Sequence, residues 1–335
     1  MKDSFYTLSP DTVLNVVEKA LNKRYPGTQA TGKAFALNSL ENRVFEIELE
    51  SEIHSDLSSE KSVVVKFYRP GRWTRSEILE EHRFIEELNN AEVPAVAALT
   101  ELEETPDGIS FIVFPKIRGR LKDELQADEL RQLGRLLARL HSVGERFDST
   151  KNRFLNLKTF GEDSLNFLKN SNFMDSNTLA RYSSLCEEIF KMIKTPLAEA
   201  PSQVVHGDCH VGNILWNESG PFFLDFDDML SAPPVQDIWM VVKGRDAEDL
   251  EMRDELIQGY EEMKDFDRST LSLVEPLRAL RMIHYSAWIA KRWQDPSFQQ
   301  MFSHFTSPAY WSEEMQALDE ILSILRYGPN FAQEY

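Results

Sequence analysis

The chain has 335 residues, of which 42% are hydrophobic and 27% charged, and its formal net charge is −18. A chain of this length can bury a sizeable core and typically divides into two domains, while its acidity argues against a general nucleic-acid or anionic-membrane surface. It starts without an apolar signal core, no run approaches the roughly 18 apolar residues of a membrane span, and Cys186 and Cys209 are too few for a disulfide framework or a zinc site, so we expect a cytoplasmic protein.

The first predicted element is a helix that opens at Ser9-Pro10-Asp11. Serine is a good N-cap and proline is tolerated in the first helical turn, so the helix is expected to run to about Asn22. The segment 50–61, rich in serine and acidic residues, is expected to form a long hairpin loop. Strands are expected around 34–38, 43–50, 61–68 and 110–114.

A lysine ends the β-branched run of the third expected strand. The run is Ser62-Val63-Val64-Val65-Lys66, and a lysine on an edge strand is usually only solvated. In the next helix, expected at 75–89, Glu81 shares a stripe with apolar residues that recur at helical spacing and indicate burial. These apolar residues are Ile78, Ile85 and Leu88. A buried carboxylate needs a cation, so Glu81 is the predicted partner of Lys66, whereas Glu80 lies about 100° away around the helix and is expected to be solvated.

The second part of the chain is predicted to be helical. Leucines at helical spacing indicate a core helix, and they are Leu130, Leu133, Leu137 and Leu140. Residues 151–200 are expected to form a helical insertion. The further expected helices are 177–194, 246–264, 270–293 and 312–326. The aromatic residues Tyr285, Trp288 and Trp293 either line a substrate pocket or, as is more common, pack between helices.

The most informative segment runs from His206 to Asn213 and reads His-Gly-Asp-Cys-His-Val-Gly-Asn, with Asp225 twelve residues further on. An Asp separated by four residues from an Asn, with a second Asp after a short hydrophobic strand, is how kinases arrange a hydroxyl-orienting base and two magnesium ligands. Apolar residues flank the turn Asn217-Glu218-Ser219-Gly220 and predict a β-hairpin that brings Asn213 and Asp225 side by side. Such a spacing alone is more often a turn-rich loop. The second Asp, the hairpin and the distant Lys66 together favour phosphoryl transfer from ATP.

Each residue of this set has a chemical role in that reaction. Transfer requires an acceptor oxygen in line with the γ-phosphate and a metal that neutralises charge. Asp208 would orient the acceptor hydroxyl and accept its proton. Asn213 and Asp225 would bind Mg²⁺, which needs few protein ligands because it retains several waters, and Lys66 would meet the α- and β-phosphates. His206 is expected to fix the loop by hydrogen bonding rather than to bind metal.

Several stretches resemble the aminoglycoside-phosphotransferase-like branch of the protein-kinase-like fold. They span most of the chain and comprise 37–45, 64–70, 206–216, 225–239 and 275–281. The resemblance implies an α+β fold with two lobes. The first, 1–115, would be an antiparallel-sheet lobe that binds the nucleotide, and the second, 116–335, a mainly helical lobe for catalysis and substrate binding.

The resemblance also implies further roles and an activity. Ser39 would contact phosphate from the covering loop, and Asp237 would hold the catalytic loop by hydrogen bonds to its backbone. Adenine would meet backbone groups near Pro115 and Ile117, where proline can offer only its carbonyl. The implied protein is a Ser/Thr protein kinase of bacterial stress survival with Mg²⁺ as cofactor and ATP as co-substrate. We expect it to act as a monomer.

The chain also departs from better-known protein kinases. The covering loop, Asn38 to Val44, contains no glycine, and only eleven residues separate Asp225 from Asp237, which leaves little room to dock an extended peptide. Gly207 stands where many protein kinases carry Arg, so switching by activation-loop phosphorylation is not expected. A kinase for a small hydroxylated metabolite, such as homoserine, choline or an aminoglycoside, therefore remains an alternative. A catalytically dead ATP-binding regulator is a third, although the residues expected for catalysis are all present.

Overall fold

The computed structural model describes residues 5–37, 39–54, 59–149 and 153–328. The chain forms two compact units, each discontinuous in sequence. Unit 1 comprises Met1–Lys151, Asp208–Met229 and Gly244–Lys264, and unit 2 comprises Asn152–Gly207, Leu230–Lys243 and Asp265–Tyr335. The boundary expected between residues 115 and 116 concerns functional lobes, which these compact units do not test, and it stays a prediction.

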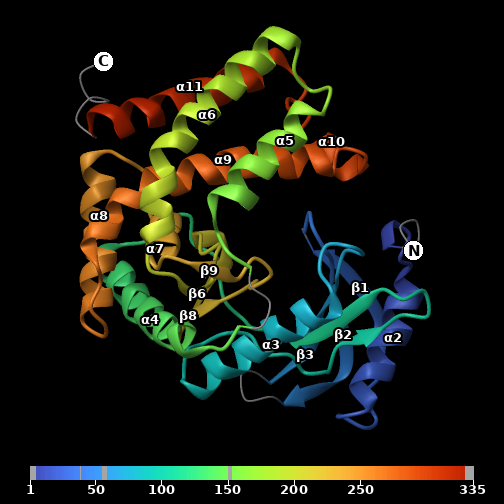
Figure 1. The fold of residues 1–335 in the computed structure, drawn as a ribbon. Helices are drawn as coiled ribbons and strands as arrows, with labels where there is room; N and C mark the ends of the chain where they lie inside the picture. Colours follow the sequence, from blue (N-terminus) through green and yellow to red (C-terminus); the bar gives the residue numbers. More distant parts are fainter. Residues whose placement is uncertain (1–4, 38, 55–58, 150–152, 329–335) are drawn as a thin grey trace. The chain divides into compact units, whose positions relative to one another are not determined.

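Unit 1 is built on an antiparallel sheet (Figure 1). In the described residues its strand order is β1 (Ala30–Leu37), β2 (Arg43–His54), β3 (Ser59–Phe67), β5 (Ser110–Pro115) and β4 (Glu103–Glu104). Strand β3 is central, and Lys66 lies opposite Val44 of β2 and Ile112 of β5. Lys66 is therefore not on an edge strand, and the edge-strand explanation of a merely solvated lysine does not apply to it.

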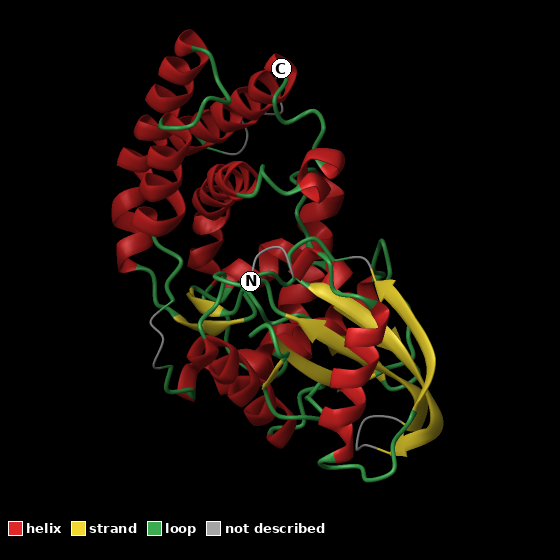
Figure 2. Ribbon diagram, turned by 90° about the vertical axis from the view of Figure 1, so that its right-hand side faces the viewer, coloured by secondary structure: helices red, strands yellow, loops and turns green. Residues whose placement is uncertain are grey.

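One face of this sheet packs against α2 (Pro10–Asn22), which lies alongside the strands in Figures 1 and 2. The helix begins as predicted, because Ser9 Oγ accepts a hydrogen bond from Thr12 N at 3.2 Å. Alternate residues of β3 point to this face, where Val63 and Val65 are almost completely buried. Helix and sheet thus share one apolar core.

The hairpin between β2 and β3 differs from the prediction. β2 continues to His54 and β3 starts at Ser59, so most of the segment 50–61 is strand rather than loop. Glu50, Ser51 and Glu52 lie at exposed positions of β2, where polar side chains are accepted. Residues 55–58, and residue 38 at the end of the predicted strand 34–38, lie outside the described part of the chain.

Helix α3 (Arg75–Asn90) follows β3 and starts with a capping box. Thr74 Oγ1 accepts from Glu77 N at 3.3 Å, and the Glu77 carboxylate accepts from Thr74 N at 2.8 Å. Glu81 is buried as the helical phase predicted. Glu80 is buried as well and lies 3.6 Å from Arg83, so the expectation of a solvated Glu80 is wrong. The helix buries a wider face than the single predicted stripe.

Two helices that are far apart in sequence, α4 (Ala127–Arg146) and α8 (Ala247–Glu261), lie side by side in unit 1 (Figure 1). The leucine stripe of α4 is buried, as predicted. A Cβ at Gly134 would come within 2.1 Å of the Leu256 carbonyl oxygen, and one at Gly259 within 2.1 Å of the Arg131 carbonyl oxygen. The two glycines therefore permit the close approach of the helices. The predicted hairpin is also present in unit 1, as β7 (Ile214–Asn217) and β8 (Gly220–Phe223).

Unit 2 is mainly helical. Its helices are η1 (Leu157–Glu162), α5 (Asp163–Lys169), α6 (Ser176–Glu199), α7 (Val235–Val241), η3 (Arg268–Leu273), α9 (Val274–Lys291), α10 (Pro296–Met301) and α11 (Pro308–Tyr327). Strands β6 (Gln203–Val205) and β9 (Leu230–Ala232) pair antiparallel. The main core lies between α6, α9 and α11, and Trp293 packs at its side with its ring 5.4 Å from that of Phe305. Trp293 therefore packs between helices, while Tyr285 is exposed.

The predicted α+β class is confirmed, with an antiparallel sheet in the N-terminal part and helices in the C-terminal part. None of the helices in the described ranges combines the length and the apolar character needed to cross a bilayer.

Candidate functional site

The loop that begins at Asp208 is fixed by hydrogen bonds among its own residues. The Asp208 carbonyl accepts from His210 N and from Asn213 Nδ2, each at 2.9 Å. His210 Nδ1 accepts from Gly212 N at 3.0 Å, and His210 Nε2 lies 3.7 Å from Asp208 Oδ2. Asn213 sits in a single turn of 3-10 helix, η2 (Val211–Asn213). Because Asn213 donates through its nitrogen, its amide oxygen can act as a ligand.

The backbone just before Asp208 is held by Asp237 of α7. Asp237 Oδ2 accepts from His206 N and Oδ1 from Gly207 N, both at 2.9 Å, and Gln236 Nε2 donates to the Gly207 carbonyl at 3.1 Å. The hydrogen bonds expected of Asp237 are thus present, and His206 takes part through its backbone N–H. Gly207 has φ 84°, a conformation that glycine adopts without strain and arginine does not, which is a physical reason for glycine at this position.

The hairpin β7–β8 places Asn213 and Asp225 at neighbouring chain positions. Ile214 pairs with Phe223, and Leu224 N donates to the Asn213 carbonyl at 2.9 Å, directly before Asp225. Asp225 has φ 54°, which few non-glycine residues adopt, and such strain is often found at functional sites. Its side chain is 52% exposed. One amide oxygen and one accessible carboxylate are the hard oxygen ligands that Mg²⁺ prefers.

Lys66 reaches Asp225 from the central strand β3. Its Nζ lies 2.9 Å from Asp225 Oδ1 and also donates to Asp227 Oδ1. Burial acts to lower the pKa of the Lys66 ammonium. The nearby carboxylates of Asp225, Asp227 and Glu81 raise it by more, so this pKa lies well above the ordinary value of lysine. Although the Asp225 side chain is half exposed, the surrounding protein desolvates its carboxylate, which acts to raise its pKa, and the ion pair with Lys66 outweighs this effect and lowers the pKa. Both groups are therefore charged at neutral pH.

Glu81 belongs to the electrostatic surroundings of Lys66. It raises the pKa of Lys66, and it adds to the effect of burial in raising the pKa of Tyr68. The Tyr68 hydroxyl lies 2.9 Å from His82 Nε2, and burial, together with Lys66, lowers the pKa of His82 to about 4. The hydrogen bonds described for Lys66 go to Asp225 and to Asp227, and Asp227 was not singled out from the sequence. The run Asp225-Phe226-Asp227-Asp228 was the signal that could have found it.

The loop between β1 and β2 is tied to the same cluster through Asn42. Asn42 Nδ2 donates to Asp227 Oδ2 at 2.6 Å, and its Oδ1 accepts from Arg69 N at 3.2 Å. Arg69 Nε also donates to the Glu41 carbonyl at 2.8 Å. Ser39 Oγ accepts from Asn42 N at 3.3 Å, which leaves its O–H available as a donor. This loop, which has no glycine, is thus anchored by side chains of neighbouring segments.

The residues expected to meet adenine lie next to the strand that carries Lys66. Pro115 ends β5 opposite Val63 of β3, on the same strand as Lys66, and Ile117 follows as a partly buried residue. The contact of Pro115 and Ile117 with adenine stays a prediction.

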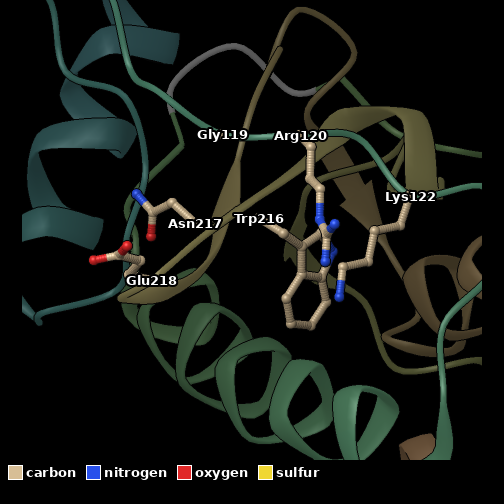
Figure 3. A pocket seen from close by; sticks show the side chains of 6 residues that line it. All are labelled: Gly119, Arg120, Lys122, Trp216, Asn217 and Glu218. Atoms are coloured by element: carbon tan, nitrogen blue, oxygen red, sulfur yellow. The ribbon is translucent and has the colours of Figure 1, made fainter.

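A pocket lies between the segment 119–122 and the β7–β8 hairpin (Figure 3). Its lining residues are Gly119, Arg120, Lys122, Trp216, Asn217 and Glu218. Arg120 and Trp216 exchange two backbone hydrogen bonds of 2.9 Å, and Lys122 Nζ lies 4.5 Å from the centre of a Trp216 ring. Lys122 also pairs with Glu129. The charge of Lys122 is thus already engaged, and the lining includes none of the predicted site residues.

The chain resembles known phosphotransferases in sequence and in structure. Residues 36–274 match the family described as "Phosphotransferase enzyme family". The chain is 33% identical to stress response kinase A of Escherichia coli over 330 residues, which are 97% of this chain and 96% of that protein. It is 32% identical, with the same coverage, to a Salmonella typhimurium protein named serine/threonine protein kinase RdoA. A solved structure of amicoumacin kinase hAmiN with AMP-PNP, Ca²⁺ and Ami has a TM-score of 0.65 at 17% identity and covers 85% of this chain and 89% of its own. The chain belongs to the phosphotransferase enzyme family.

Proposed function

We propose that the protein is an ATP-dependent Ser/Thr protein kinase of the bacterial stress response, which transfers the γ-phosphate to a hydroxyl group. The observation that carries the proposal is the ion pair between Lys66 and Asp225, at 2.9 Å. It joins the central strand of the sheet to the hairpin that carries Asn213, and Asn213 in turn donates to the carbonyl of Asp208. These contacts connect, within unit 1, the residues to which we assign phosphate binding, metal binding and orientation of the acceptor.

In this mechanism the residues act as follows. Asp208 orients the acceptor hydroxyl and takes its proton. The amide oxygen of Asn213 and the ionised carboxylate of Asp225 would hold Mg²⁺, and the lowered pKa of Asp225 suits that role. Magnesium, when bound, neutralises charge on the phosphates. Lys66 exchanges Asp225 for the α- and β-phosphates, and the Ser39 hydroxyl donates to phosphate.

The remaining assignments complete the proposal. The Pro115 carbonyl and the backbone of Ile117 meet adenine, so that the nucleotide lobe ends near residue 115. The protein is proposed to act as a cytoplasmic monomer that binds neither nucleic acid nor membrane, consistent with its net charge of −18. The near full-length similarity to two proteins named as kinases supports a protein acceptor, since one of these names specifies serine and threonine.

A small hydroxylated acceptor is the second candidate. The eleven residues between Asp225 and Asp237 include β9, which is already paired with β6. Little of this short segment is left to serve as a platform for an extended peptide. The amicoumacin kinase structure, whose fold is similar, was solved with the small molecule Ami.

Incubation of the purified protein with γ-labelled ATP distinguishes the candidates. The acceptors would be the protein alone, a dephosphorylated cell lysate, and a panel containing homoserine, choline and aminoglycosides, each with Asp208→Asn as the control. Label on serine or threonine of lysate proteins supports the protein kinase, whereas label only on a small alcohol supports the alternative. Binding of ATP without transfer to any acceptor would indicate a regulator and would contradict both.

A further inference from the structure

Arg72, in the connection between β3 and α3, contacts three carboxylates at once. Its NH2 group donates to Asp228 Oδ1 at 2.8 Å and its NH1 group to Asp227 Oδ2 at 3.3 Å, while its Nε lies 3.4 Å from Glu41 Oε1. The guanidinium also lies 4.7 Å from the centre of the Trp73 ring. Only 10% of the Arg72 side chain is exposed. This degree of burial and pairing is unusual for a residue in a short connecting loop.

The chemistry of this position calls for arginine in particular. Burial acts to lower the pKa of the guanidinium, and Asp228, Asp227 and Glu41 together raise it, so Arg72 stays charged. A planar guanidinium presents donors in several fixed directions and can pair with three carboxylates, whereas the single ammonium of lysine cannot reach all of them. Breaking such a buried set leaves uncompensated charges behind.

Asp227 links Arg72 to the phosphate-binding lysine. Its carboxylate is only 3% exposed, and it receives Lys66 on Oδ1 and both Arg72 and Asn42 on Oδ2. Asp225, by contrast, is accessible to a metal ion. If Asp225 held a metal ion instead of Lys66, Asp227 would remain the buried carboxylate that binds the Lys66 ammonium. Arg72 holds the Asp227 carboxylate in this position, because its NH1 group donates to Asp227 Oδ2.

Arg72 also reaches the phosphate-covering loop. Glu41 belongs to that loop and contacts Arg72 directly. Asp227 connects Arg72 to Asn42, which belongs to the same loop. In a loop without glycine, the approach to phosphate depends on how the loop is anchored. Arg72 therefore connects the covering loop, the lysine strand and the segment that carries the metal ligand.

We propose that Arg72 is a positioning residue of the nucleotide site, which acts through Asp227 to hold Lys66 and through Glu41 to hold the covering loop against the phosphates. The inference deepens the proposed function and rests on it. It assigns to Arg72 a contribution to phosphate binding that does not extend to the nucleoside.

The test compares binding of two ligands by calorimetry in the presence of Mg²⁺. Wild type, Arg72→Gln and the control Arg75→Gln are titrated with ADP, which carries α- and β-phosphates, and with adenosine, which carries neither. Arg75 begins the adjoining helix and pairs with Glu104 at 3.5 Å, with both side chains 53% exposed. We expect Arg72→Gln to raise the Kd of ADP by about tenfold or more while the Kd of adenosine stays within about twofold. The control should match wild type for both ligands.

Two further variants separate positioning from damage to the fold. Arg72→Lys keeps a cation near Asp227, so its Kd for ADP should lie between those of wild type and Arg72→Gln. In a Lys66→Met background, Arg72→Gln should weaken ADP binding by much less than it does alone, because residues that act through one another are not additive.

Three results would count against these ideas. Unchanged ADP binding by Arg72→Gln would overturn the inference, and so would an equal loss of ADP and adenosine binding, which would indicate general damage to the site. Failure of the wild-type protein to bind ADP would instead overturn the proposed function, and the inference with it.

Discussion

At the scale of single residues, the two carboxylates that bind Lys66 are not equivalent. The Asp225 side chain is 52% exposed and that of Asp227 only 3%. A group accessible to solvent can exchange one partner for another, while a buried ionised group must keep its partners because desolvation is costly. This difference is consistent with the proposal that Asp225 leaves Lys66 for a metal ion, whereas Asp227 is suited to a permanent ion pair.

Asp208→Asn should abolish phosphoryl transfer and leave the fold intact. The Asp208 group that holds Asn213 is the backbone carbonyl, so the loop keeps this hydrogen bond in the variant. Loss of the general base typically costs about 10²–10⁴ in rate. We expect kcat to fall by at least about 10² with an unchanged melting temperature. A folded Asp208→Asn protein with wild-type rates would refute the assignment.

Asp225→Ala should remove the dependence of nucleotide binding on magnesium. In wild type, ATP should raise the melting temperature more with Mg²⁺ than with EDTA, because a ligand that binds only the native state stabilises it by mass action. Asp225→Ala should erase that difference. Glu218→Ala, in the exposed turn of the same hairpin, serves as the control and should retain it. An undiminished magnesium effect in Asp225→Ala would show that Asp225 is not a ligand.

Site residues that lie close together in the sequence could be predicted, whereas those that meet only in the folded chain could not. Asp208, Asn213 and Asp225 belong to one contiguous stretch with a short hairpin, so their spacing could be interpreted directly. Arg72 and Asp227 are 155 residues apart, and only the folded chain shows that they meet. No local pattern marks an arginine as buried. The long-range ion pairs that organise the site were thus beyond sequence reasoning.

At the scale of elements, local signals predicted those that have clear ends and repeats. The N-cap Ser9 fixed the start of α2, and the apolar runs around the turn at 217–220 fixed the β7–β8 hairpin. The short elements β4 and α10 were missed, since two and six residues give too little periodicity to detect. The predicted strands of the β2–β3 hairpin were too short, because their exposed polar residues have a composition typical of loops.

The phase of helix α3 leads to a prediction about its two buried glutamates. Lys66→Met, Glu81→Gln and the double variant should lose similar factors in kcat/KM for ATP, because Glu81 acts through Lys66 and the losses are then not additive. Glu80 pairs with Arg83, whose side chain is 46% exposed. Glu80→Gln, which keeps a side chain of similar shape, should leave ATP use unchanged.

These steady-state measurements distinguish which of the two glutamates, Glu80 or Glu81, acts together with Lys66. If Glu80→Gln were the damaging change and Glu81→Gln mild, the two glutamates would have to exchange roles. Additive losses in the double variant would show that Lys66 and Glu81 act independently.

At the scale of the whole molecule, each compact unit gathers segments from distant parts of the chain. Unit 1 combines the N-terminal sheet with 208–229 and 244–264. The loop that begins at Asp208 and the β7–β8 hairpin thus belong to the same compact unit as the strand of Lys66. Sequence periodicity reports individual helices and strands, and it carries no information on which of them pack together. This grouping could therefore not be predicted, although the fold class could.

In unit 2, the stability should depend on pH through Glu314 of α11. Its Oε1 accepts from Ser286 Oγ at 2.9 Å, and Ser286 Oγ lies 2.8 Å from the Tyr310 hydroxyl. Burial raises the pKa of Glu314 to about 7, and the hydrogen bond from Ser286 opposes this only in part. The native state thus keeps a proton that the unfolded chain loses near pH 4.5. The free energy of unfolding should fall as the pH rises from about 4.5 through 7, by at most about 3 kcal/mol.

Glu314→Gln tests this dependence, because a neutral amide of similar shape needs no proton. Urea unfolding between pH 5 and 8, followed by tryptophan fluorescence, should show a smaller decrease with pH in the variant than in wild type. At pH 8 the variant should be the more stable protein. Glu313→Gln, at the exposed neighbouring position, should retain the wild-type profile. The same decrease in Glu314→Gln as in wild type would mean that another group titrates, and that Glu314 is ionised in the native protein at neutral pH.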